Sequence, residues 1–202
     1  MREIGRLVLV LGLIGSFSAL ALSYVRETLQ PRIERQSDFY VRGPALERLF
    51  DTPASQLLRN KIIVDVDGLS YPIFYSKRGD ELAGLAVEAS GQGGYGGDVV
   101  IMIGIDLKNS KVLGVEIVSH SETPGLGARI EKKAFRRQWK KLVLGASVAL
   151  RASGGQVDAI TGATFSSKAM IHGTNQVLDL IKNHEEDIRN QIALVDNRTN
   201  VE

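Results

Sequence analysis

A threonine lies beside small residues, just before a helix-like segment, in the sequence Asp-Ala-Ile-Thr-Gly-Ala-Thr at positions 158–164. Gly162 and Ala163 carry almost no side chain, so a bulky ligand can approach the main chain, and Gly162 can adopt a positive φ. The N–H groups and the dipole at a helix start stabilise an anion. The segment therefore predicts a phosphate-binding turn with the hydroxyl of Thr164 at the helix start. A plain helix cap is the alternative, because Thr, Ser and Gly precede many helices.

The residues after this turn have a helical pattern. Apolar or small residues recur at four-residue spacing, which predicts one buried face of a helix over 164–189. These residues are Phe165, Ala169, Gly173, Val177 and Ile181.

A second glycine-containing segment has the sequence His-Ser-Glu-Thr-Pro-Gly-Leu-Gly at 120–127. It follows a Gly-Tyr-Gly-Gly loop at 94–97 and strand-like sequence at 99–106. A turn built on Pro-Gly needs no ligand to explain it. A faint repeat, 84–87 against 114–117, suggests that each loop ends a hairpin and that both loops lie on one rim. Coincidence is the alternative explanation of this repeat.

Taken together, the segments at 158–164 and 120–127 resemble the FMN-binding domain shared by two proteins of ion-pumping complexes. These are the G subunit of the Rnf electron-transport complex and the C subunit of the sodium-pumping NADH:quinone reductase. The order of the two motifs after an N-terminal membrane helix favours the G subunit. In that family a flavin transferase that uses FAD esterifies the last threonine of the signature to the FMN phosphate. The resemblance therefore implies covalent FMN on Thr164, through a phosphoester.

The resemblance also implies roles for residues around Thr164. Those expected near the phosphate are Thr161, Gly162, Ala163, Ser166 and Ser167. Those expected near the ring are Glu122, Thr123, Gly125 and Leu126. His120 is expected to be a packing residue at the end of a strand, and orienting Glu122 is the alternative. Trp139 is preferred to Tyr95 as a stacking aromatic, and core packing is the alternative for both. A flavin carries the redox chemistry itself, so these side chains are expected to position it, and no independent catalytic site is expected.

Composition limits the remaining possibilities. With 202 residues, 44% of them hydrophobic, the chain has room for one membrane segment and one globular domain. The net charge of +2, without basic stretches interleaved with aromatics, argues against nucleic-acid binding. The absence of cysteine excludes thiolate-held Fe–S clusters and c-type haem, and the scattered histidines predict no metal site.

An uncharged stretch at 7–25 is long enough to cross a bilayer. A cleaved signal peptide is the alternative, because Arg2 and Arg6 precede the stretch and Ala-Leu-Ala at 19–21 resembles a cleavage site. Arginines flank the stretch on both sides, so charge does not set its orientation. The resemblance implies a short cytoplasmic segment at 1–6 and an extracytoplasmic FMN domain, in a single-pass protein of the cell (inner) membrane.

The rest of the chain predicts a linker or helix extension at 26–39 and an α+β domain over 40–202. Strands are expected at 61–67, 69–76, 81–89, 99–106 and 111–119, in a sheet with one packed face. Helices are expected at 44–50, 130–139 and 164–189. The basic residues of the 130–139 helix and its flanks form either a solvated face or a docking surface for an acidic partner protein or anionic lipid.

These expectations describe a membrane-anchored electron-transfer subunit of an Rnf-type ion-translocating ferredoxin:NAD oxidoreductase complex. Its partners would be the other subunits of the complex, membrane lipid and, during maturation, the flavin transferase. Two alternatives stay open. One is the C subunit of the quinone reductase, and the other is a non-catalytic, membrane-tethered binding or assembly module in which the turn at 158–164 only caps a helix.

Overall fold

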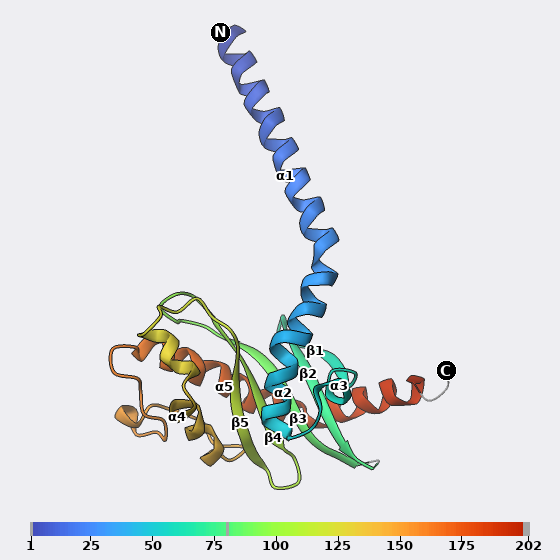
Figure 1. Ribbon diagram of the computed structural model, residues 1–202, viewed down its shortest axis with the longest axis vertical. Coiled ribbons are helices and arrows are strands. Elements are labelled where there is room, and N and C mark those ends of the chain that lie inside the picture. The colour runs from blue at the N-terminus through green and yellow to red at the C-terminus, as the bar shows by residue number, and fades with distance from the viewer. Residues whose placement is uncertain (1, 80, 200–202) are drawn as a thin grey trace. The chain divides into compact units, whose positions relative to one another are not determined.

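The computed structural model describes residues 2–79 and 81–199, which form two compact units, Met1–Tyr40 and Val41–Glu202 (Figure 1). The first unit contains the helix α1 (Arg2–Ser37), which passes into a π-helical turn, η1 (Asp38–Arg42). The predicted linker at 26–39 is thus an extension of the helix, which continues through Pro31.

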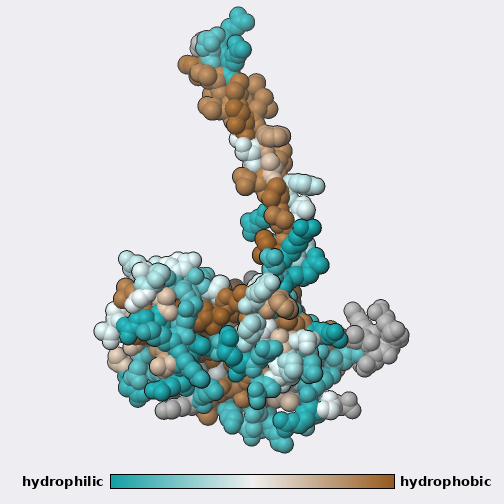
Figure 2. Space-filling model, viewed as in Figure 1, coloured by the Kyte–Doolittle hydropathy of each residue, from teal (hydrophilic) through white to brown (hydrophobic). Residues whose placement is uncertain are grey.

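The N-terminal helix is apolar and long. Its most apolar 18-residue window has a mean hydropathy of 2.1, and no residue of α1 is buried. Figure 2 shows the apolar side chains along the middle of α1 and hydrophilic ones at its N-terminal end. By length and composition it can cross a membrane, and among the described residues it is the one helix that can.

The second unit is built on an antiparallel sheet in which every strand pairs with its neighbour in sequence, in the order β1-β2-β3-β4-β5. The strands are β1 (Lys61–Val66), β2 (Leu69–Arg78), β3 (Glu81–Gly91), β4 (Val99–Asp106) and β5 (Lys111–Ser119). Asp67 and Gly68 both have positive φ, 52° and 77°, as the two-residue hairpin between β1 and β2 requires. The α+β prediction is confirmed.

Both faces of the sheet are covered, so the prediction of one packed face was wrong. One face packs against the long helix α5 (Thr164–Thr199), which bends at His184. The other face lies under the short helices α2 (Gly43–Phe50) and α3 (Ala54–Leu57). Leu49 of α2 sits so close to Gly104 and Gly114 that a Cβ there would lie 3.2 and 3.4 Å from it. The alternation in β5 placed Gly114 on the open side of the sheet, but α2 covers that side, with Leu49 beside Gly114.

The segment between the sheet and α5 is irregular. It contains η2 (Gly127–Glu131), α4 (Lys133–Arg136), η3 (Arg137–Lys141) and η4 (Arg151–Ser153), in place of the single helix predicted at 130–139. Lys132 has extended backbone angles that separate η2 from α4. Ile130, Phe135 and Trp139 are all buried in the main core, and this burial outweighs the helical propensity of the segment.

The first turns of helix α5 approach the end of β3 very closely. A Cβ on Gly91 would lie 2.0 Å from the carbonyl oxygen of Ala169, and one on Gly173 would lie 3.1 Å from the backbone nitrogen of Gly91. Glycine at both positions therefore sets the distance between the first turns of α5 and the sheet.

Replacing Gly91 by alanine is expected to destabilise the full-length chain by about 1–3 kcal/mol or more, because the helix must move to admit the methyl group. Urea unfolding in detergent, followed by the fluorescence of the single tryptophan, measures this loss. Gly114→Ala is the matched control, since its Cβ would meet Leu49 at an ordinary 3.4 Å. Equal stability of both variants would contradict the prediction.

Candidate functional site

The residues at 160–163 form a tight turn that leads directly into α5. The N–H of Ala163 donates to the carbonyl of Ile160 at 2.9 Å, and Gly162 has φ +80°, as in the third residue of a type II turn. Helix α5 begins at Thr164, where the sequence predicted it. The Thr164 side chain is exposed, and its hydroxyl forms no hydrogen bond with any described residue. It therefore does not act as a capping group.

Ser167 holds this turn from inside. Its buried hydroxyl donates to the carbonyl of Ala163 at 3.0 Å and accepts the N–H of Ile160 at 3.0 Å. The hydroxyl predicted near the phosphate is thus engaged in the architecture of the turn, so Ser167 is not among the proposed ligand contacts.

Glu122 connects this turn to the two glycine-containing loops. Its carboxylate accepts hydrogen bonds from the hydroxyl of Ser166 at 2.8 Å and from the N–H of Gly96 at 3.3 Å. Cβ atoms on Gly94 and Gly127 would lie only 2.5 and 2.2 Å from its two oxygens. The loops at 94–97 and 120–127 therefore lie on one rim, beside the start of α5.

His120 contacts Glu122 through the backbone. Its Nδ1 accepts the N–H of Glu122 at 3.0 Å, and its Nε2 lies 3.0 Å from Glu131 Oε1. Because Nδ1 accepts, the ring proton is on Nε2, which donates to Glu131. These contacts agree with the alternative in which His120 orients Glu122, and Glu131 fixes the ring.

A pocket of about 210 Å³ opens where the three segments meet. It is lined by Tyr95, Glu122, Thr123, Leu126, Gly127, Gly162, Ala163, Phe165 and Ser166. Three of these, Tyr95, Phe165 and Leu126, are large apolar side chains that are 77%, 63% and 43% exposed. Exposed apolar groups gathered at a pocket are typical of a binding surface. Thr164 lies between two lining residues, Ala163 and Phe165.

The remaining predicted residues lie elsewhere. Gly125 is in the turn behind Leu126, with φ +76°, and does not line the pocket. Thr161 faces a larger groove on the opposite side of the turn. Which residues contact a flavin stays a prediction, and the geometry groups Glu122, Thr123, Leu126, Gly162, Ala163 and Ser166 around one pocket.

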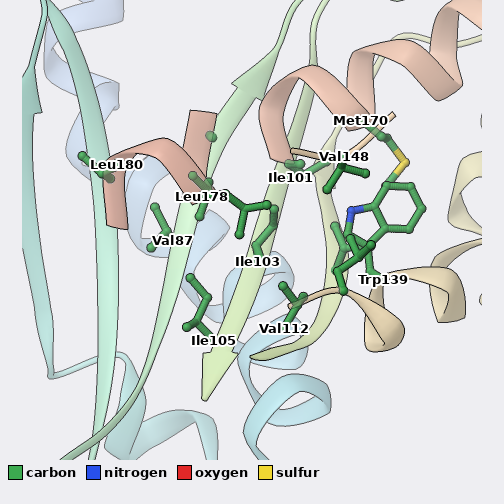
Figure 3. Packing of buried hydrophobic residues seen from close by; sticks show 14 of the residues in the cluster. Val87, Ile101, Ile103, Ile105, Val112, Trp139, Val148, Met170, Leu178 and Leu180 are labelled. Atoms are coloured by element: carbon green, nitrogen blue, oxygen red, sulfur yellow. The ribbon is translucent and has the colours of Figure 1, made fainter. Parts of the chain in front are cut away.

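Trp139 does not belong to this pocket. Its side chain is fully buried, its Nε1 donates to Thr174 Oγ1 at 2.8 Å, and its ring lies edge-on to Phe135 with centroids 5.3 Å apart. Figure 3 shows it among Val112, Val148 and Met170. The alternative interpretation as a core residue holds for Trp139, and Tyr95 is the aromatic at the pocket.

Phe165 was missed as a site residue. The four-residue spacing placed it on the buried face of α5, and the other four residues of that series, Ala169, Gly173, Val177 and Ile181, are buried, but Phe165 itself is exposed. In the first turn of α5 the buried side chains are instead the polar Ser166 and Ser167. An aromatic residue directly after the signature threonine was the one signal available in the sequence.

The groove on the other side of the turn has a volume of about 1030 Å³ and is basic. Its charged lining residues are Arg129, Lys132, Arg137, Lys140, Arg151 and Asp158. Asp158 forms two hydrogen bonds with Arg151, at 2.6 and 3.3 Å, which fasten the start of the signature segment. This contact with Asp158 raises the pKa of the Arg151 guanidinium.

Comparison with known proteins places these features in a family. The family model of the FMN-binding domain matches residues 94–179, which contain all the segments around the pocket. The G subunit of the ion-translocating oxidoreductase complex from Methanosarcina acetivorans is 30% identical over 191 residues, covering 91% of this chain and 97% of the relative. The chain belongs to the G-subunit family of ion-translocating oxidoreductase complexes. The prediction of this family is confirmed, and the C subunit of the quinone reductase is set aside.

Other relatives agree with this assignment. The G subunit from Aliivibrio fischeri (strain ATCC 700601 / ES114) is 33% identical over 126 residues, or 58% of this chain and 59% of the relative, so less than two thirds of that relative is matched. A crystal structure of the C subunit of the Na(+)-translocating NADH-quinone reductase from Parabacteroides distasonis is 20% identical. It superposes with a TM-score of 0.52 over 76% of this chain and 92% of the other, which shows the same fold.

Proposed function

We propose that this G-subunit homologue carries FMN covalently on Thr164 and transfers electrons within an Rnf-type ion-translocating ferredoxin:NAD oxidoreductase complex. The observation that carries the proposal is the state of Thr164. Its hydroxyl is exposed and has no partner among the described residues, although it lies at the first residue of a helix and beside the pocket. A threonine that only capped the helix would direct its oxygen to a backbone N–H of the first turn.

The residues around Thr164 fit a flavin nucleotide in two parts. The phosphate would lie at the start of α5, where backbone N–H groups and the helix dipole favour an anion. The ring would lie against Tyr95, Leu126 and Phe165, which present apolar surface at the pocket. When bound, FMN supplies the electron-transfer chemistry, and the protein positions it.

The small size of the pocket agrees with a tethered cofactor. About 210 Å³ is below the range of roughly 300–1,000 Å³ that encloses a whole drug-sized ligand. A ring held here stays partly accessible, as exchange of electrons with a neighbouring protein requires. A covalent bond to Thr164 supplies the retention that shallow burial does not.

The arrangement in the membrane follows from the same proposal. The N-terminal helix anchors the chain in the lipid of the cell membrane, with residues 1–6 in the cytoplasm and the FMN domain on the extracytoplasmic side. The partners are the other subunits of the complex and, during maturation, a flavin transferase that uses FAD. Transfer of the FMN moiety from FAD to the Thr164 oxygen breaks the pyrophosphate bond of FAD, forms the phosphoester, and releases AMP and the hydroxyl proton.

Intact mass of the purified full-length chain, co-expressed with the flavin transferase, tests the proposal. We expect an increase by the mass of FMN less one water, and a fluorescent flavin band after denaturing electrophoresis. An unmodified mass with a dark band would contradict the proposal and favour the alternative of a membrane-tethered binding or assembly module.

A further inference from the structure

The described part of the domain contains three buried glutamates, and one of them differs from the others. Glu88 pairs with Arg42 at 2.6 Å, and Glu116 pairs with Arg48 at 2.7 Å and also with Arg136. Glu122 is the most buried of the three, with 5% of its surface exposed. Within the described residues it forms no ion pair, and its hydrogen-bond donors are neutral.

Burial of a carboxylate without a cation is costly, because protein dipoles replace the lost hydration incompletely. The fold accommodates the Glu122 carboxylate closely, since only glycine fits at positions 94 and 127 beside its two oxygens. Two hydrogen bonds to the loops could be made equally well by a neutral amide. The negative charge itself is therefore not explained by holding the loops together.

The position of the charge suggests what it does. Glu122 lines the pocket between Tyr95 and Phe165, on the side of the first turn of α5. Charges in such a partly desolvated site interact more strongly than in water. We propose, resting on the function proposed above, that Glu122 lowers the redox potential of the flavin in this pocket. An electron added to the ring from a donor brings negative charge toward a fixed carboxylate, which opposes the addition.

Glu122 is thus a tuning and positioning residue that exchanges no electron, proton or bond. Glu122→Gln removes the charge and keeps the shape, because the amide oxygen can accept from the N–H of Gly96 while the amide group donates to Ser166. Glu131→Gln is the matched control. It removes the same charge from a side chain that is 61% exposed, while the amide oxygen can still accept the hydrogen bond from His120 Nε2.

The experiment is a spectroelectrochemical titration of the full-length flavinylated protein with dithionite as reductant. We expect Glu122→Gln to favour the reduced flavin by about tenfold or more, which is about 59 mV upward for a one-electron step. Glu131→Gln is expected to shift the midpoint potential of the flavin much less, because solvent and salt screen the charge of Glu131. A flavinylated Glu122→Gln protein with the midpoint potential of the wild type overturns the inference.

The thermal stability of the same variants is a second readout. If the buried charge of Glu122 destabilises the fold, Glu122→Gln folds and has a melting temperature at least equal to that of the wild type. A variant that does not fold, or melts lower, shows that the carboxylate serves the fold and overturns the inference. A wild-type chain without flavin is a different result, which overturns the proposed function.

Discussion

Thr164→Val is expected to abolish covalent flavin while leaving the fold intact. Valine has nearly the shape of threonine and lacks the hydroxyl that the phosphoester requires. Because that hydroxyl is exposed and bonded to no described residue, its removal should change the free energy of unfolding by no more than about 0.5 kcal/mol. In-gel flavin fluorescence and intact mass measure the loss, and urea unfolding checks the stability.

Two controls accompany this variant. Thr164→Ser keeps a hydroxyl at the same place on the helix and is expected to retain the flavin band. Thr52→Val makes the same chemical change in the loop after α2, away from the turn, and is expected to leave labelling unchanged. A fluorescent Thr164→Val band would move the attachment to another residue.

Trp139→Ala is expected to cause the largest loss of stability, about 3–5 kcal/mol. The side chain is fully buried, packs edge-on against Phe135 and donates to Thr174, so its removal leaves a large cavity in the main core. Urea unfolding followed by far-UV circular dichroism measures the loss, since the variant has no tryptophan left to report by fluorescence.

The flavin content and absorption spectrum of the variant distinguish a core role of Trp139 from a role in cofactor binding. We expect the variant, where it is folded, to carry as much covalent flavin as the wild type, with an unchanged absorption spectrum. Trp139→Phe, which keeps the contact with Phe135, is expected to cost clearly less stability. A small loss of stability together with an altered flavin spectrum would restore the prediction that Trp139 lies at the ring.

The strands were predictable because each follows local rules. Turn residues such as Asp67 and Gly68 mark the hairpins, and a meander of neighbouring strands needs no long-range information. The segment at 127–141 was predicted less well. Its apolar residues have a spacing close to that of a helix. In the structure, however, the buried Ile130, Phe135 and Trp139 lie on three separate short helices.

The site was predictable in part for the same reason. The turn at 160–163 and the helix start at Thr164 depend on a few consecutive residues, so the sequence carried them. The sides of Phe165 and Trp139 depend on which face of an element meets the sheet. In the first turn of α5 the polar Ser166 and Ser167 are buried and the aromatic Phe165 is exposed, which is the reverse of what polarity alone predicts.

The sequence alone determined the kind of protein: an apolar N-terminal helix, an α+β domain and two motifs in the order of the G-subunit family. Only the tertiary structure decided that loops near residues 95, 122 and 163 share one pocket, with Tyr95 and Phe165 rather than Trp139 at its rim. Among the described residues, it also left Glu122 without the arginine partner that Glu88 and Glu116 have. Contacts between residues far apart in the chain depend on how whole elements pack, and packing is a property of the assembled core.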